Sequence, residues 1–220
     1  MRRYLTSLLI LLLGYLTPAL SRAQTLQVGL HIQSERLDLA YAQSVRNTDL
    51  SRLNLVWHEQ LASWLDGTIH LGKFRLTQDS NPIPAGQATD GTTIGLGLRF
   101  HLYRGSRLDI ASDLGYQYAD STASLSGQTV NMSWHQVSGQ IQASIRLFSY
   151  SYLSLAAGAL AIHGDERASG TITSVNSFHN NTSGFARAGL LLGLDRDSHI
   201  GIEVDTGAVT GGRIVFQRWF

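Results

Sequence analysis

The sequence predicts an all-β fold, a transmembrane antiparallel up-and-down β-barrel of ten strands. Three observations favour this fold. Apolar and polar residues alternate along most of the chain, as they do in a strand with two different faces. Short and long connections alternate between these segments, which places turns at one end of a barrel and loops at the other. After residue 23, proline occurs only at Pro82 and Pro84, which suits a chain that is nearly all paired strand.

Residues 1–23 have the three parts of a secretory signal peptide. Arg2 and Arg3 form a basic start, an apolar run follows, and residues 21–23 form a small-x-small cleavage site. The alternative is a permanent membrane anchor, which needs roughly 20 apolar residues, and this run is shorter and interrupted. We therefore expect cleavage and one exported domain over residues 24–220.

The composition of the mature chain excludes some partners. Removing Arg2, Arg3 and Arg22 from the 17 basic residues leaves 14 against 16 acidic ones, a net charge of −2. Because neither sign dominates, we expect no nucleic-acid partner. The chain has no cysteine, so hydrogen bonding and burial must stabilise it without the disulfides common in exported domains.

Ten segments carry the alternation. They span residues 26–33, 53–58, 67–76, 94–102, 108–117, 137–147, 153–162, 186–194, 200–205 and 214–220. Within 67–76 the apolar parity changes between Leu71 and Phe74, which predicts a β-bulge. The last segment ends the chain on Phe220, as expected of a sheet whose last strand pairs with its first. Eight strands remain open if residues 50–76 form one long strand pair with an excursion, or if the first pair is irregular.

The connections fall into two sets. Short ones are expected at residues 103–106, 148–151 and 195–198, with a looser one near 59–66. Long polar ones are expected at residues 43–49, 77–91, 120–129 and 164–184, and 207–212 forms the last connection on that side. The long segments are rich in Ser, Thr, Asn and Gly, which is typical of surface loops.

Alternation alone does not say which face lies outside, and a soluble barrel such as a lipocalin is the alternative. Three features favour lipid outside. The polar faces carry charges of both signs, which can pair in an interior. Strands of about ten residues match a tilted strand that crosses a bilayer. Aromatic residues gather near strand ends, as interfacial girdles do: Tyr103, Phe148, Tyr150, Tyr152, Trp219 and Phe220.

The signal peptide, the amphipathic strands and the ending RIVFQRWF together resemble the small outer-membrane β-barrels of Gram-negative bacteria, the OmpA/OmpX-like group. In that group the barrel-assembly machinery reads a C-terminal Phe with apolar residues at alternate preceding positions. Ile214, Phe216 and Phe220 match this assembly signal, and Arg218 departs from it. The resemblance implies the cell outer membrane as location. It also implies outer-membrane lipid, lipopolysaccharide and the assembly machinery as partners.

Charged residues on the polar faces are expected to lie inside the barrel, because buried charges need partners. They are Arg99, Asp109, Asp113, Arg146, Arg187, Glu203 and Asp205. Side chains fill the interior of a narrow barrel, so we expect a mostly plugged, charge-paired lumen. The expected role is structural or surface interaction, with residues 164–184 as a contact for an extracellular ligand. A narrow pore for small solutes is the alternative.

A lipid-A modifying enzyme is the second alternative. It would need histidine beside serine or acidic residues in the loops. The candidates are His163 with Asp165 and Glu166, His179 with Ser177 and Ser183, and His135 with Ser133. None has a recognised family spacing, and the histidines lack tight metal-ligand spacing. We therefore assign no catalytic residue, no cofactor and no metal site.

Overall fold

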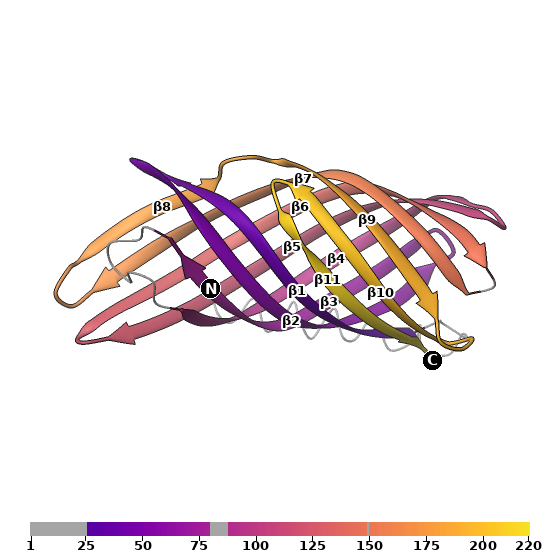
Figure 1. Cartoon of the computed structure of the whole chain (residues 1–220), viewed down its shortest axis with the longest axis horizontal. Coiled ribbons are helices and arrows are strands. Elements are labelled where there is room, and N and C mark those ends of the chain that lie inside the picture. The colour runs from indigo at the N-terminus through magenta and orange to yellow at the C-terminus, as the bar shows by residue number, and fades with distance from the viewer. Residues whose placement is uncertain (1–25, 80–87, 149) are drawn as a thin grey trace.

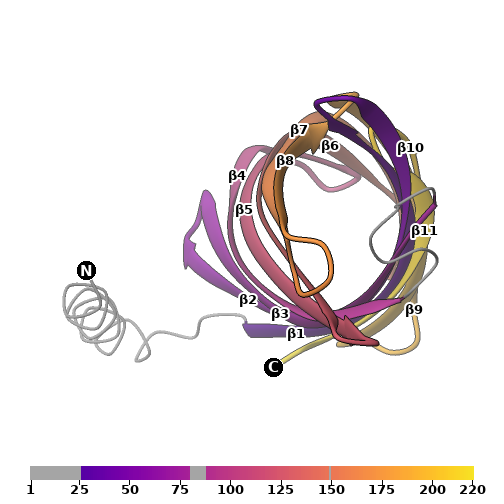
Figure 2. The same ribbon diagram turned by 90° about the vertical axis from the view of Figure 1, so that its left-hand side faces the viewer.

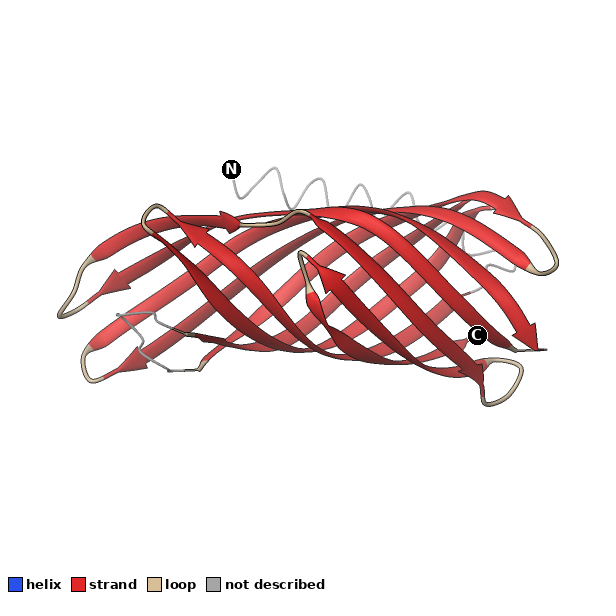
Figure 3. Ribbon diagram, turned by 45° about the horizontal axis from the view of Figure 1, so that its top comes forward, coloured by secondary structure: helices blue, strands red, loops and turns tan. Residues whose placement is uncertain are grey.

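The computed structural model describes residues 26–79, 88–148 and 150–220. The expected signal peptide and both remaining prolines lie outside these residues. The described chain consists of strands and their connections (Figure 3). The strands are β1 Leu26–Tyr41, β2 Ser44–Ala62, β3 Leu65–Gln78, β4 Thr89–Arg104, β5 Leu108–Leu125, β6 Gln128–Phe148, β7 Ser151–Ser169, β8 Ser174–Asn180, β9 Gly184–Gly193, β10 Ser198–Gly207 and β11 Thr210–Trp219. Within these residues no helix is long and apolar enough to cross a membrane.

Ten of these strands close into a ring, as the sequence predicts. Neighbours pair antiparallel from β1 to β7, and the order continues through β9, β10 and β11. The last strand then pairs with the first, with Gln27 opposite Trp219 and Arg36 opposite Thr210. The tilted strands wrap the axis in Figure 1, and the end-on view in Figure 2 shows the ring. The predicted up-and-down barrel and its closing strand are therefore confirmed.

The remaining strand, β8, makes a second ring. It pairs with β7 at residues 163–168 and with β1 at residues 39–41. The pairing of β9, β10 and β11 stops short of this level, so β8 alone joins β7 to β1. The barrel thus has ten strands in the part that holds the C-terminus and eight in the part that holds β8 (Figure 1). We call these the membrane part and the upper part, and the level where they meet the seam.

The two faces of the wall exchange character between these parts. In the membrane part the outward side chains are apolar and exposed, as Ile32 on β1 is at 53%. Farther along β1 the outward positions become polar at Arg36 and Asp38, while the inward Leu37 and Leu39 are buried. An outward apolar belt suits lipid, and a polar outer face with an apolar interior suits water. The upper part is therefore a water-facing extension of a membrane barrel.

This exchange explains the parity change within 67–76 and corrects the predicted bulge. Leu71 faces outward in the apolar belt, whereas Phe74 faces inward at 4% exposure. From Leu65 to Leu76 the register of β3 against β4 shows no shift. The strand is regular, but its outer face passes from lipid into water. The apolar residues therefore change from outward to inward positions without an extra residue.

The same exchange corrects the predicted strand lengths and loops. Strands β1 to β7 have 14 to 21 residues instead of about ten. Most of the polar stretches at 43–49 and 120–129 are strand, and 164–184 is largely the β7–β8 hairpin. Every second side chain in these stretches is polar and points outward into water, so their composition resembles that of surface loops.

A buried apolar cluster fills the interior of the upper part. Phe74 and Trp134 meet edge to face at 5.0 Å, and Tyr41 packs on Phe178 at 5.3 Å between ring centroids. We call this cluster the apolar seal. Its members are Leu37, Leu39, Leu50, Phe74, Leu76, Ala119, Val130, Met132, Trp134, Leu160, Ile162, Ala168, Phe178, Ala208 and Val209.

A buried ion pair lies beside the seal. Arg46 and Glu166 are 3.3 Å apart, and the Arg46 guanidinium lies 4.0 Å from the ring centroid of Tyr41. Burial raises the pKa of the Tyr41 hydroxyl to about 12, so this hydroxyl stays neutral beside the carboxylate. The interior of the upper part is therefore closed by packed side chains and by a paired charge.

The aromatic girdle differs in part from the expectation. Tyr103, Phe148, Tyr150 and Phe220 are exposed, all near the short-turn end. Tyr152 and Trp219 instead occupy inward positions and line the lumen. Both lie on the strand parity that faces inward, which their closeness to chain turns had obscured. Trp64 joins the outer set, stacked on Phe100 at 6.1 Å between ring centroids.

Candidate functional site: the lumen of the membrane part

The lumen of the membrane part contains a cavity of about 700 Å³. It reaches from Arg104 and Arg146 at the short turns to Glu35 and Val209 near the seam. Phe74, Met132, Trp134 and Phe178 of the apolar seal do not line it. The cavity therefore lies below the seal and does not continue through the upper part.

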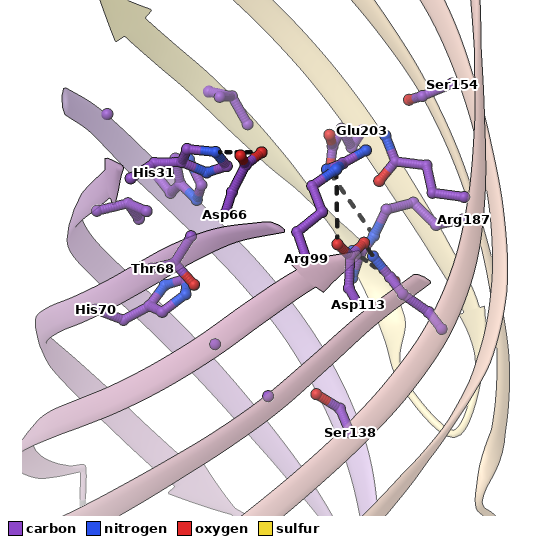
Figure 4. A pocket seen from close by; sticks show the side chains of 18 of the residues that line it. His31, Asp66, Thr68, His70, Arg99, Asp113, Ser138, Ser154, Arg187 and Glu203 are labelled. Carbon is purple, nitrogen blue, oxygen red and sulfur yellow. Dashed lines mark hydrogen bonds and ion pairs between the residues drawn. The ribbon is translucent and has the colours of Figure 1, made fainter. Parts of the chain in front are cut away.

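The seven charged residues predicted for the lumen all occupy inward strand positions, and six of them meet in two groups. In the first group, the Arg99 guanidinium lies 3.7 Å from Asp113 (Figure 4) and 4.0 Å from Asp109. In the second, Arg187 lies 2.6 Å from Asp205 and 3.7 Å from Glu203. The seventh, Arg146, lies apart at the short-turn end.

A glutamine joins the two groups. The Gln140 amide donates to Asp113 at 2.8 Å, and Arg187 donates to the Gln140 carbonyl at 3.3 Å. The network thus crosses from β4 and β5 through β6 to β9 and β10. Arg213 of β11 extends it by donating to Glu203.

Arg146 makes a different contact. Its guanidinium lies 5.6 Å from the ring centroid of Tyr152 and donates to the Tyr152 hydroxyl at 3.5 Å. Among the described residues, no carboxylate lies within ion-pair distance of it. Its side chain is exposed at the short-turn end, where water can solvate the charge.

Sequence reasoning missed a third group just below the seal. Arg52 lies 2.9 Å from Glu35, and both side chains are almost fully buried. This contact is ionic without hydrogen-bond geometry. Arg52 also donates to Gln117 at 2.8 Å, and Gln33 donates to Glu35 at 2.9 Å. The group places a buried ion pair at the end of the cavity nearest the seal.

A fourth group, also missed, lies toward the short turns. One oxygen of Asp66 is 2.6 Å from His101 and 3.1 Å from His58, and Arg104 lies 3.7 Å from the other oxygen. The second ring nitrogen of His101 faces Asp109 at 3.3 Å. Both ring nitrogens therefore face carboxylates, and both can donate only when the ring carries a proton on each.

The missed residues had a signal in the alternation. Arg52 alternates with Leu53 and Leu55, and Arg213 alternates with Ile214 and Phe216, so both belong to the inward parity. Asp66 was hidden because residues 59–66 were expected to be a loose turn, whereas β2 and β3 are joined by only residues 63–64.

Two histidine side chains also face the cavity. His31 and His70 point into it from one side (Figure 4). The lining includes six arginines and five acidic residues, and Asp205 pairs with Arg187 from behind. The lining sets are Arg52, Arg99, Arg104, Arg146, Arg187 and Arg213 against Glu35, Asp66, Asp109, Asp113 and Glu203. The lumen is thus close to charge balance.

The histidines considered for an enzyme face away from the lumen. His135, His163 and His179 are exposed on the outer face, where His135 hydrogen-bonds the Tyr116 hydroxyl at 2.6 Å. His163 and His179 face each other at 6.5 Å between ring centroids. No hydrogen bond joins any of these three rings to a serine in the described part of the chain.

The acidic neighbours of these histidines are engaged elsewhere. Asp165 accepts a hydrogen bond from Ser177 at 2.8 Å, and Glu166 pairs inward with Arg46. Across residues 26–79, 88–148 and 150–220, no group of three or more His, Cys, Asp or Glu side chains is placed to hold a metal ion.

The residues of the expected assembly signal share one face of β11 and the chain end. Ile214, Phe216 and Phe220 are exposed on the outward side, at 49%, 42% and 69%. Arg218 lies on the same side, and its guanidinium is 5.6 Å from the ring centroid of Phe220. At the short-turn end such a side chain can reach the head groups.

Comparison with known proteins shows the fold. No protein-family profile and no curated protein sequence matches the chain. The β-domain of the Bordetella autotransporter BrkA is 11% identical with a TM-score of 0.52, covering 90% of this chain and 99% of that one. The translocator domain of the autotransporter NalP from Neisseria meningitidis is 11% identical with a TM-score of 0.51, covering 97% and 95%. The outer-membrane protein OprG from Pseudomonas aeruginosa is 10% identical with a TM-score of 0.49, covering 88% and 95%.

The two autotransporter domains have TM-scores above 0.5, and their likeness shows that this chain has the fold of a bacterial outer-membrane β-barrel. The likeness agrees with the predicted fold class and outer-membrane location. Sequence identities of 10–11% give no information about activity.

The lumenal network generates a stability prediction. Replacing Arg187 by alanine leaves Asp205 buried without its cation, and breaking a buried pair in this way costs about 3–5 kcal/mol. We expect Arg187→Ala to lower the temperature at which the folded, fast-migrating form is lost on a denaturing gel. Arg36→Ala is the matched control, because its partner Asp49 lies with it on the exposed outer face. Equal transition temperatures for the two variants would contradict the assignment.

Proposed function

We propose that this chain is a non-conducting outer-membrane barrel with a surface-interaction role. Its membrane part anchors it, and its upper part presents a rigid sheet surface outside the cell. The observation that carries this proposal is the apolar seal. Solutes crossing along the axis would have to pass Leu50, Met132 and Trp134, which are at most 3% exposed. Packed apolar side chains leave no hydrated path for an ion.

The tips of the upper part support the contact role. Leu125, Ile172 and Val175 are exposed apolar side chains at the ends of two hairpins, at 60%, 47% and 65%. Gln128 ties the hairpins together, accepting from the Ile172 amide at 2.8 Å and donating to its carbonyl at 2.9 Å. A fixed set of exposed apolar groups is typical of an interaction site. The segment 164–184 expected to meet an extracellular ligand thus includes a held hairpin.

A narrow pore is the second candidate, and the cavity of about 700 Å³ is the observation that favours it. In that case the seal would have to open during conduction. The enzyme alternative has less support, because its candidate histidines lie on the outer face without serine partners among the described residues.

Planar-bilayer recordings separate the first two candidates. We expect the purified barrel to show no steady conductance, because the seal blocks the axis. Arg99→Ala is the informative variant, since it removes a lumenal charge and leaves the seal intact. It should remain closed. Steady conductance of the native protein would contradict the proposal, and conductance appearing only in Arg99→Ala would move the barrier from the seal to the charge network.

Thiol labelling on intact cells tests the orientation that the contact role requires. The chain has no cysteine, so a single introduced thiol reports one position. We expect Val175→Cys to react with a membrane-impermeant maleimide on whole cells, because it is exposed at the tip of the upper part. Ser63→Cys, in the turn between β2 and β3 at the opposite end, should react only after lysis. The reverse pattern would place the upper part in the periplasm.

A further inference from the structure

The wall at the seam is held differently from the rest of the barrel. On β1, pairing with β11 ends at Arg36 and pairing with β8 begins at Leu39. On β7, pairing with β9 ends at Ala159 and pairing with β8 begins at His163. The strand ladder is therefore interrupted on both sides of the place where ten strands become eight.

A side chain takes the place of the missing ladder on β7. The Ile162 amide donates to the side-chain carbonyl of Asn180 at 2.8 Å, and the Asn180 amide donates to the Leu160 carbonyl at 2.8 Å. The Leu160 amide donates to the Ser183 carbonyl at 2.8 Å. These bonds hold β8 firmly to β7, so the β7–β8 hairpin is one unit.

On the β1 side the same hairpin is attached weakly. Three residue pairs join β8 to β1 over residues 39–41, and the Asn181 amide adds one bond to the Asp38 carbonyl at 2.9 Å. In contrast, β1 pairs with β2 along all of its 16 residues. A typical hydrogen bond contributes about 1 kcal/mol net, so β1 is held much less firmly to β8 than to β2.

The interior behind this contact combines an aromatic contact with a buried ion pair, and it leads to the cavity. Phe178 of β8 packs on Tyr41 of β1 at 5.3 Å between ring centroids. The Arg46–Glu166 pair lies beside them, with the Tyr41 hydroxyl donating to Glu166 at 3.4 Å. Leu160 and Val209 belong both to the apolar seal and to the lining of the cavity. Parting β1 from β8 would therefore open a path that passes apolar side chains and ends in the polar lumen.

The exterior at the seam is a boundary between two surfaces. On the β7 and β9 side the outward residues are small and apolar: Ala159, Ala161 and Ala186 are all exposed. On the β1 side the outward residues are Arg36 and Asp38, also exposed. A molecule with an apolar body and a polar end matches both sides of such a boundary.

We propose that the contact between β1 and β8 is a lateral gate. A small apolar or single-chain amphiphilic molecule passes through it between the outer face of the barrel and the lumenal cavity. The gate opens when residues 39–41 of β1 and the β8 strand move apart, while β7 stays paired with β6. The path runs through the side wall, so the gate is compatible with a barrel closed to ions along its axis and goes beyond the contact role proposed above.

A disulfide across the gate tests this inference. Ala40 and His179 are opposite each other in the register on the outward side, and facing strand residues lie within the Cα separation that a disulfide needs. Ala40→Cys with His179→Cys locks the gate in a chain that has no other cysteine. The matched control is Thr92→Cys with Asp120→Cys, an opposite outward pair on β4 and β5.

The probe is a diazirine-bearing stearic acid in proteoliposomes of dimyristoyl phosphatidylcholine, with labelled residues mapped by mass spectrometry. We expect label on the inward residues Leu39, Phe178 and Val209 when the gate pair is reduced, and loss of that label when it is oxidised. Label on the outward belt should not change, which controls for probe supply. Both redox states of the control pair should keep the inward label.

Two results would overturn the gate. One is inward label of equal strength in the oxidised and reduced gate pair. The other is label confined to the outward belt in every form. Heat-modifiable migration on a gel verifies that each variant is folded. Bilayer conductance of the same samples reports on the axial seal, so failure of the gate is distinguishable from failure of the non-conducting role.

Discussion

The constraint on which the structure depends is that a sheet crossing lipid can have no unpaired edge. In the membrane part the last strand meets that constraint by pairing with the first over residues 27–36 and 210–219. In the upper part three strands have ended, and β8 closes the gap they leave. The seam between the two closures is the one level where side-chain bonds from Asn180 replace the ladder on β7. The way the ring is closed thus explains both the long strand pairing in the membrane part and the short contact between β1 and β8.

The same alternation of apolar and polar residues serves two solvents. In lipid the apolar residues must face outward, so the polar residues face inward. Their charges pair in the networks of Arg99, Arg187 and Arg52. In water the apolar parity turns inward and packs as the seal. The polar lumen of about 700 Å³ and the apolar seal above it both arise because the same seven long strands pass from lipid into water.

The sequence predicted the membrane part well. The alternation identified the ten strands of the ring and the closing pair. Prediction from the sequence failed above the membrane, because the outward residues of a water-facing strand are polar, as loop residues are. For this reason β8 and the upper halves of β5 and β6 were not recognised as strands. The change of parity near Leu71 marks the place where the strand passes from lipid into water, and not a bulge. Partners such as Arg46 with Glu166 could not be derived, because they depend on the register around a closed ring, which no single segment encodes. Tyr152 and Trp219 were misplaced because turn proximity was weighed above parity.

A nitroxide scan along β6, from Gln128 to Phe148, tests the exchange of faces most directly. Each residue is replaced in turn by a spin-labelled cysteine, and collision with oxygen is compared with collision with a water-soluble nickel chelate. The account predicts oxygen contact at the odd positions from Val137 to Leu147, nickel contact at Asn131 and Ser133, and protection from both at Val130, Met132 and Trp134. Nickel contact at Met132 and Trp134 would contradict it, and so would oxygen contact continuing unchanged through Asn131.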